Sequence, residues 1–251
     1  MERRPLIAGN WKMNLGIVAS KNLAEQIRQS ASKATDRDVM IAPTFTSLPI
    51  VAAALEGSNV LMAGQNVCWE ENGAFTAEIS PTMLLELGCS FAIIGHSERR
   101  HIFGEDDALI NRRIKGAMKF GLTPIHCIGE TLDDREADKT MTILESQLRK
   151  GLQDITLSKA DNLVIAYEPV WAIGTGKTAS KEQAQEVHAF VRDILADIFE
   201  KSIASEMRIL YGGSVNPENV DSLMGQKDID GALVGGAALK ADIFDRIIHF
   251  R

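Results

Sequence analysis

The chain has 251 residues, with 27 Lys and Arg against 34 Asp and Glu, which gives a net charge of -7. This acidic balance argues against nucleic acid or an anionic membrane surface as the main partner. Apolar residues make up 45% of the sequence, yet they never form the run of ~18 that a membrane span needs. The first residues lack the apolar block of a secretory signal, and the three cysteines show no C-x-x-C spacing. We therefore expect a cytoplasmic protein without a membrane partner.

Short apolar runs recur along the chain, each followed in most cases by a stretch with helical spacing. The runs cover residues 5–11, 39–43, 59–64, 91–95, 123–129, 163–168, 207–213 and 231–236. They are apolar throughout, as is typical of parallel strands that are buried on both faces. Helices are predicted at 17–29, 108–120, 135–152 and 181–201, the last with Ser180 as N-cap and Gln183 three residues later. The alternation predicts one (β/α)₈ barrel domain over residues 1–251.

Two nucleotide-binding architectures fit the sequence less well. A doubly wound sheet would need a GxGxxG turn after its first strand, where this chain has polar side chains between Gly9 and Asn14. The segment from Gly174 to Thr178 resembles the end of a GxxxxGK[ST] phosphate loop, but Trp171 occupies the place of that motif's first glycine. We therefore favour the barrel, whose enzymes carry their chemistry on the loops that follow the strands.

Polar and small residues that could take part in catalysis or binding follow seven of the eight predicted strands. Each has an ordinary explanation when taken alone: Lys12 as a solvated charge, His96 as a hydrogen-bonded core residue, Glu98 as a surface acid. Because the carboxyl ends of the strands meet at one end of a barrel, we expect them to lie together. The set comprises Asn10, Lys12, Gln65, Asn66, His96, Ser97, Glu98, Cys127, Glu130, Glu168, Tyr211 to Ser214, Gly235 and Gly236.

Five motifs together resemble the triosephosphate isomerase family. They are GNWKMN at 9–14, FAIIGHSERR at 91–100, AYEPVWAIGTGKTA at 166–179, YGGSV at 211–215 and DGALVGGAAL at 230–239. The resemblance spans the chain in the family's order. It implies an aldose-ketose isomerase that interconverts dihydroxyacetone phosphate and glyceraldehyde 3-phosphate through an enediol or enediolate. No His, Cys and acid cluster shows metal-ligand spacing, so we expect no metal, and the resemblance implies an enzyme that needs no other cofactor.

The resemblance also implies a role for each catalytic position. Glu168 matches the base, and Pro169 after it favours extended backbone at the strand's end. His96 matches the electrophile, kept neutral by the positive end of a helical turn that begins at Ser97. Lys12 supplies positive charge, with Asn10 orienting the substrate and Glu98 as the acid partner of the lysine.

Phosphate binding and water exclusion are implied at further positions. The family holds phosphate on backbone N–H groups, here those of Gly174, Ser214, Gly235 and Gly236. The lid and its clamp match Trp171, Ile173, Tyr211 and Leu233, of which Ile173 and Leu233 would crowd the base on closure. In the closed state Tyr211 and Ser214 would hydrogen-bond the lid backbone. Trp171 would change its hydrogen-bond partner from Tyr167 to Glu130. A closed lid would keep water from an intermediate that can eliminate phosphate.

The segment 65–80 resembles the family's interface loop, so a homodimer is implied, with Thr76 buttressing Asn10 and Lys12 of the partner. Ala77 stands where the family usually has glycine, and we expect its φ to be negative. Two other functions stay open at this point. An aldolase would use Lys12 as a Schiff base, and a non-catalytic module would only bind phosphate.

Overall fold

The computed structural model describes residues 3–172 and 179–251. In this part of the chain eight parallel strands close into a barrel in sequence order. The strands are β1 (Leu6–Asn10), β2 (Asp38–Ala42), β3 (Val60–Gly64), β4 (Phe91–Ile94), β5 (Thr123–Ile128), β6 (Val164–Tyr167), β7 (Arg208–Tyr211) and β8 (Gly231–Val234). The α-helices are α1 (Ile17–Ala31), α2 (Leu48–Ala54), α3 (Pro81–Glu86), α4 (Ser97–His101), α5 (Asp107–Phe120), α6 (Leu132–Glu136), α7 (Thr140–Gly151), α8 (Lys181–Ile198), α9 (Lys201–Glu206), α10 (Val220–Met224) and α11 (Ala241–Ile248). Short 3₁₀ helices are η1 (Phe45–Ser47), η2 (Ala160–Asn162), η3 (Val170–Ala172) and η4 (Gly236–Leu239).

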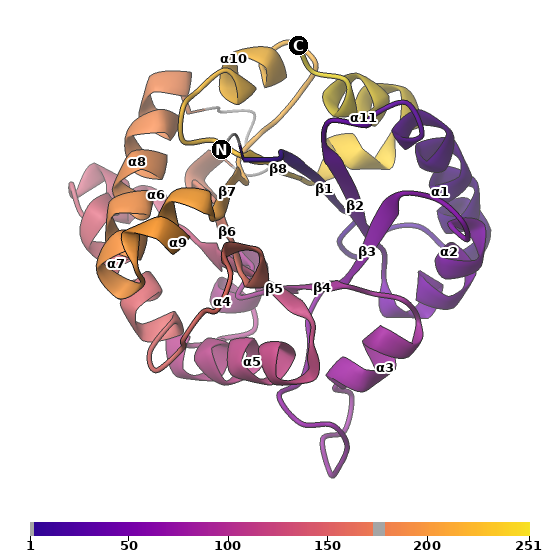
Figure 1. Ribbon diagram of the computed structural model, residues 1–251, viewed down its shortest axis with the longest axis horizontal. Helices are drawn as coiled ribbons and strands as arrows, with labels where there is room; N and C mark the ends of the chain where they lie inside the picture. The colour runs from indigo at the N-terminus through magenta and orange to yellow at the C-terminus, as the bar shows by residue number, and fades with distance from the viewer. Residues whose placement is uncertain (1–2, 173–178) are drawn as a thin grey trace.

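The predicted (β/α)₈ barrel is confirmed. Each predicted apolar run coincides with one strand, although β2 begins one residue before its run, and β1 pairs with both β2 and β8, which closes the sheet. The helices form a ring around the strands (Figure 1). All strand carboxyl ends therefore open at the same end of the barrel, where the loops can bring distant residues together.

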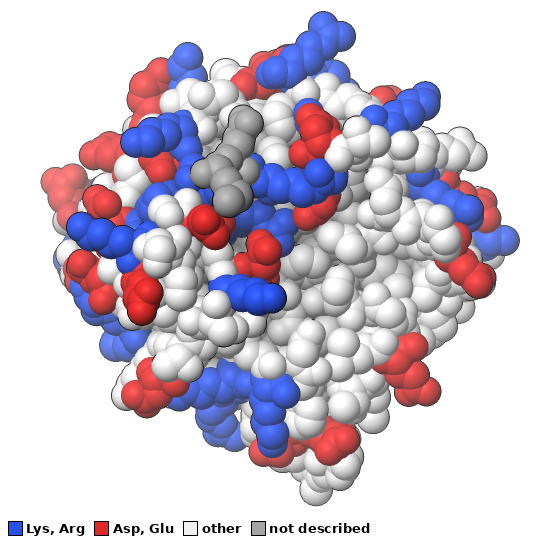
Figure 2. Space-filling view, viewed as in Figure 1, with Lys and Arg blue, Asp and Glu red and all other residues white. Residues whose placement is uncertain are grey.

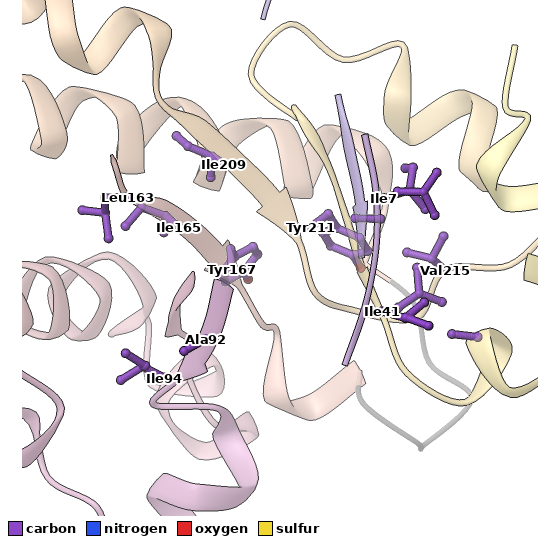
Figure 3. Close-up of a cluster of buried hydrophobic side chains, with 14 of the residues drawn as sticks. Ile7, Ile41, Ala92, Ile94, Leu163, Ile165, Tyr167, Ile209, Tyr211 and Val215 are labelled. Atoms are coloured by element: carbon purple, nitrogen blue, oxygen red, sulfur yellow. The ribbon is translucent and has the colours of Figure 1, made fainter. Parts of the chain in front are cut away.

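Alternate residues of each strand build two apolar layers. One set fills the barrel interior, including Leu6 and Ala8 of β1 and Met40 of β2. The intervening residues, such as Ile7 and Ile41, face the helices and join their apolar sides in the larger core; Figure 3 shows part of it. Successive strand side chains point to opposite faces, so strands buried on both sides are mostly apolar, with buried His126 in β5 and Arg208 in β7 among the exceptions.

Helix boundaries follow local signals where those exist. Ser180 and Gln183 form the predicted capping box at the start of α8, with both reciprocal hydrogen bonds present. The helix predicted at 135–152 is two helices, α6 and α7, separated by a segment in which Asp138 has a φ of +55°. That left-handed residue breaks the helical path. The helix predicted to reach 201 ends at Ile198.

The loop between β3 and α3 projects beyond the ring of helices at the lower edge of Figure 1. The expectation for Ala77 in this loop is wrong, because its φ is +75°. The Glu78 N–H donates to the Phe75 carbonyl at 3.0 Å, so Ala77 is the third residue of a four-residue turn. A type II turn requires positive φ at that place, which is why glycine is its usual occupant.

Candidate active site

A cavity of about 370 Å³ lies at the carboxyl end of the barrel. It brings together residues that the sequence separates by more than 200 positions, and most predicted catalytic and phosphate-binding positions line it. The lining residues are Asn10, Lys12, His96, Glu168, Gly212 to Asn216, Leu233 and Gly235 to Ala237. Its size suits a small-molecule ligand.

Glu168 directly follows β6 and is only 2% exposed. Its Oε1 lies 2.9 Å from Nε2 of His96, and its Oε2 accepts the backbone N–H of Ser97 at 2.9 Å. Burial raises the pKa of Glu168, but the charge and hydrogen bond of His96 and the Ser97 amide outweigh it, so the pKa lies below its ordinary value. The carboxylate is therefore ionised in this arrangement.

Two glycines let the neighbouring backbone approach Glu168. A Cβ at Gly212 would lie 2.8 Å from Cγ of Glu168, and one at Gly129 would overlap the Glu168 carbonyl oxygen. Both positions come from the loops that follow β5 and β7, on either side of β6. Larger residues there would displace the carboxylate.

His96 caps the N-terminus of α4, as the predicted helical turn at Ser97 requires. Its Nδ1 accepts the backbone N–H of Glu98 at 3.2 Å, which leaves the ring proton on Nε2, facing Glu168. Burial lowers the pKa of His96, but the adjacent Glu168 carboxylate more than offsets it, so the pKa is raised. The charge state of this ring is thus tied to the position of Glu168.

Lys12 is held at both its side chain and its backbone. Its Nζ donates to Oε1 of Glu98 at 2.9 Å, and its backbone N–H donates to Oδ1 of Asn10 at 3.0 Å. The backbone is left-handed, with a φ of +51°, a conformation that a non-glycine residue keeps only when its surroundings enforce it. A Cβ at Gly235 would lie 3.4 Å from Cε of Lys12, so the lysine runs beside the predicted phosphate-binding turn.

The far wall of the cavity consists of Ser214, Gly235 and Gly236, with Gly235 immediately before η4. Leu233 lies in the cavity wall and is buried in the barrel interior. Ile173 and Gly174 lie outside the described residues, so their predicted lid and phosphate contacts stay predictions.

Glu130 anchors the chain just before those residues. Its buried Oε1 accepts from Nε1 of Trp171 at 2.8 Å and from the Tyr167 hydroxyl at 3.1 Å. Arg135 also donates to this oxygen at 3.1 Å, and its guanidinium lies over the Trp171 ring at 4.9 Å. The Trp171–Glu130 hydrogen bond is the one expected of the closed state, whereas a change of the Trp171 partner from Tyr167 to Glu130 stays a prediction.

Tyr211, at the end of β7, is buried. Burial raises the pKa of its hydroxyl to about 12, and a hydrogen bond from the backbone amide of Ala179 opposes this rise.

The sequence interpretation gave no role to Arg135 or to the side chain of Gln65. Arg135 could have been suspected from its position five residues after a buried acid. Gln65 carries no local signal, because the groups that it contacts, the carbonyls of Lys12 and Ala42, come from other strands. Within the described ranges, no group of three or more His, Cys, Asp or Glu is arranged to hold a metal, and the absence of a cofactor stays a prediction.

Comparisons with known proteins agree with this geometry. The family model described as "Triosephosphate isomerase" matches residues 5–251. Proteins named triosephosphate isomerase are 52% identical in Syntrophotalea carbinolica and 53% identical in Geobacter metallireducens, each alignment covering 99% of both chains. The relative from Carboxydothermus hydrogenoformans is 50% identical over 98% of both chains. The chain belongs to the triosephosphate isomerase family.

Proposed function

We propose that this member of the triosephosphate isomerase family interconverts dihydroxyacetone phosphate and D-glyceraldehyde 3-phosphate, with Glu168 as the base. The observation that carries the proposal is one cavity lined by a buried carboxylate, an imidazole, an ammonium and a glycine-rich turn. Proton transfer between adjacent carbons needs a base, a hydrogen-bond donor at oxygen and an anion clamp. The cavity offers each of these from a different strand end.

The base becomes stronger as it turns toward the substrate. In the arrangement described, His96 and the Ser97 amide hold Glu168 and lower its pKa. A carboxylate that leaves them to meet a carbon-bound proton loses this stabilisation but stays buried, beside Leu233. Burial alone raises the pKa of a carboxyl group. Substrate binding therefore moves Glu168 from a hydrogen-bonded, weakly basic state toward a competent base.

The same movement changes His96. With Glu168 withdrawn, the ring loses the carboxylate that raises its pKa, while burial and the charge of Lys12 continue to lower it. The neutral ring keeps Nδ1 as an acceptor for the Glu98 amide and presents Nε2–H to a substrate oxygen. Lys12 adds positive charge where the oxyanion of an enediolate would develop, and Asn10 lines the same wall.

The phosphate group is assigned to the other wall. Backbone N–H groups of Ser214, Gly235 and Gly236 supply neutral donors, and Gly236 begins η4. Glycine allows the main chain to approach an anion closely. Lys12 lies beside this turn, so one ammonium serves both the phosphate and the reacting oxygen. Gly174 of the predicted lid would add a further donor.

Glu168→Gln tests the assignment of the base. The change keeps the shape of the side chain but removes its basicity, so kcat should fall by about 10²-fold to 10⁴-fold. Affinity for 2-phosphoglycolate, a phosphate-bearing mimic of the enediolate, should persist. Glu56→Gln, at an exposed residue after α2, is the matched control and should leave kcat unchanged. A loss confined to KM would contradict the assignment.

Two experiments separate the alternatives. Borohydride reduction in the presence of substrate would add mass at Lys12 only if the lysine formed a Schiff base. Nζ of Lys12 is held by Glu98 at 2.9 Å, so this nitrogen is engaged in an ion pair, which argues against its use as a Schiff-base nucleophile in an aldolase. A coupled isomerisation assay distinguishes an enzyme from a phosphate-binding module, since the module would show no turnover.

We further propose that two copies of the chain form a homodimer through the projecting loop. The proposal is supported by large apolar side chains that are exposed: Met13 is 93% exposed and Phe103 66%. Clusters of such side chains are typical of protein interfaces. Met13 and Phe103 also line a second cavity of about 190 Å³, together with Asn10, Lys12 and Glu98.

The loop itself is suited to enter that second cavity in a partner. Residues 72–77, at its tip, are exposed and carry no charge, and the loop projects at the lower edge of Figure 2 with an uncharged tip. Thr76 is one of these residues. A loop tip inserted beside Asn10 and Lys12 would couple association to activity. Because each chain carries both the loop and the second cavity, the loop of a second copy can fill the cavity of the first.

The cytoplasm is the proposed location. Cys68, Cys89 and Cys127 are all unpaired and buried, as fits a reducing compartment. Within the described residues, no helix combines the length and the apolarity needed to cross a membrane.

A further inference from the structure

Lys12 keeps a left-handed backbone between β1 and α1, with a φ of +51°. Its N–H donates to Oδ1 of Asn10, the last residue of β1 and only two residues away. Its carbonyl is taken by Gln65, which follows β3, two strands away in the barrel. The Gln65 amide therefore ties the lysine's main chain to a different part of the barrel.

Gln65 makes two hydrogen bonds with one nitrogen. Its Nε2 donates to the Lys12 carbonyl at 2.8 Å and to the Ala42 carbonyl, at the end of β2, at 2.9 Å. Both hydrogens of the amide are thus used, on the ends of two adjacent strands. The side chain is half-buried, so these bonds are partly shielded from water.

We propose that Gln65 is a positioning residue for Lys12: it fixes the left-handed lysine backbone and so directs the ammonium toward the substrate. The inference rests on the proposed function, in which Lys12 supplies positive charge to the phosphate and to the reacting oxygen of the substrate. Without Gln65, the Lys12 peptide can relax toward negative φ, which L-residues prefer. Relaxation would rotate the side chain away from Glu98 and from the turn at Gly235. Glu98 alone cannot prevent this, because it restrains only the tip of a flexible side chain.

The primary test is Gln65→Met, which keeps the length of the side chain and removes both donors. We expect kcat/KM to fall about tenfold, which corresponds to about 1.4 kcal/mol, and the Kd of 2-phosphoglycolate to rise by a similar factor. Gln65→Glu places an acceptor against two carbonyls and should lose at least as much. Gln65→Asn has a side chain too short to reach both carbonyls. It replaces either variant if that variant folds poorly, and the same loss of kcat/KM is expected.

Gln185→Met is the matched control. Gln185, on α8, also makes two side-chain hydrogen bonds, both to Asp228, and it does not line the cavity. Its loss should lower the unfolding temperature and leave kcat/KM within about twofold of the unmodified enzyme. Sedimentation at the assay concentration checks that each variant keeps the oligomeric state of the parent.

A double-mutant cycle with Lys12→Met, which removes the ammonium, separates positioning from general stability. If Gln65 acts through Lys12, Gln65→Met should cost little in the Lys12→Met background, because residues that act as a unit are non-additive. Full additivity, or an unchanged kcat/KM for Gln65→Met alone, would overturn the proposal. If Lys12→Met itself leaves kcat/KM intact, the assigned role of Lys12 fails instead.

Discussion

Ala77→Gly probes the strain in the projecting loop. Ala77 has a φ of +75° as the third residue of the turn from Phe75 to Glu78. The left-handed region costs a residue with a Cβ about 1–2 kcal/mol. Glycine would remove that cost but would also increase the freedom of the unfolded chain, which destabilises by about 0.4–1 kcal/mol. Relief of the strain outweighs the added freedom of the unfolded chain, so we expect Ala77→Gly to raise the free energy of unfolding by about 1 kcal/mol.

An increase of this size should raise the unfolding temperature by about 2–4 °C in a chain of this length. The measurement is thermal and urea denaturation of both proteins at the same concentration, because association also contributes to stability. Ala53→Gly is the control: Ala53 is exposed in helix α2, where the same substitution should destabilise by about 0.5–1 kcal/mol. If both variants lose stability equally, the turn carries no strain and the reasoning is wrong.

Three further substitutions test other parts of the molecule. Tyr211→Phe should weaken 2-phosphoglycolate binding by about 0.5–1.5 kcal/mol, one neutral hydrogen bond, and should increase the methylglyoxal released per isomer formed; an unchanged product ratio would argue against a clamp. Thr76→Arg should shift sedimentation toward the monomer and lower specific activity about tenfold or more, because it forces a long, charged side chain into the partner's cavity beside Lys12; a fully active monomer would exclude the partner's loop from catalysis. Burial lowers the pKa of His126 to about 3 from 6.5, so the unfolded chain binds the extra proton and stability should fall by about 1.4 kcal/mol per pH unit as the pH drops from 6.5 toward 3. In urea denaturation at pH 4–7, His126→Leu should make the free energy of unfolding depend less steeply on pH, by the contribution of one proton. The same pH dependence in both proteins would show that His126 does not contribute.

Local sequence was sufficient for the elements whose signals are local. The continuous apolar runs predicted the strands, because a parallel barrel strand is buried on both faces. Ser180 and Gln183 predicted the start of α8, because a capping box uses only neighbouring groups. The break between α6 and α7 escaped prediction, since Asp138 adopts positive φ at a position where no glycine marks the turn.

The candidate site was predicted as a set of residues, and its geometry came only from the fold. Strand order places Asn10, His96, Glu168 and Gly235 at one barrel end, so their meeting follows once a barrel is assumed. The tertiary structure alone decided that His96 and the Ser97 amide hold Glu168, since that contact joins loops after two different strands.

The backbone conformations of two residues show most clearly what the residue type alone does not determine. Lys12 and Ala77 both have positive φ, although neither residue type favours it. The sequence determined that a lysine follows β1 and that an alanine lies in the projecting loop. A contact from elsewhere holds the Lys12 conformation, because Gln65 bonds its carbonyl from the end of β3. Ala77 is held by its own turn, which the hydrogen bond from Glu78 to Phe75 closes. A chain's local preferences are worth about 1 kcal/mol per residue, and such contacts are strong enough to override them.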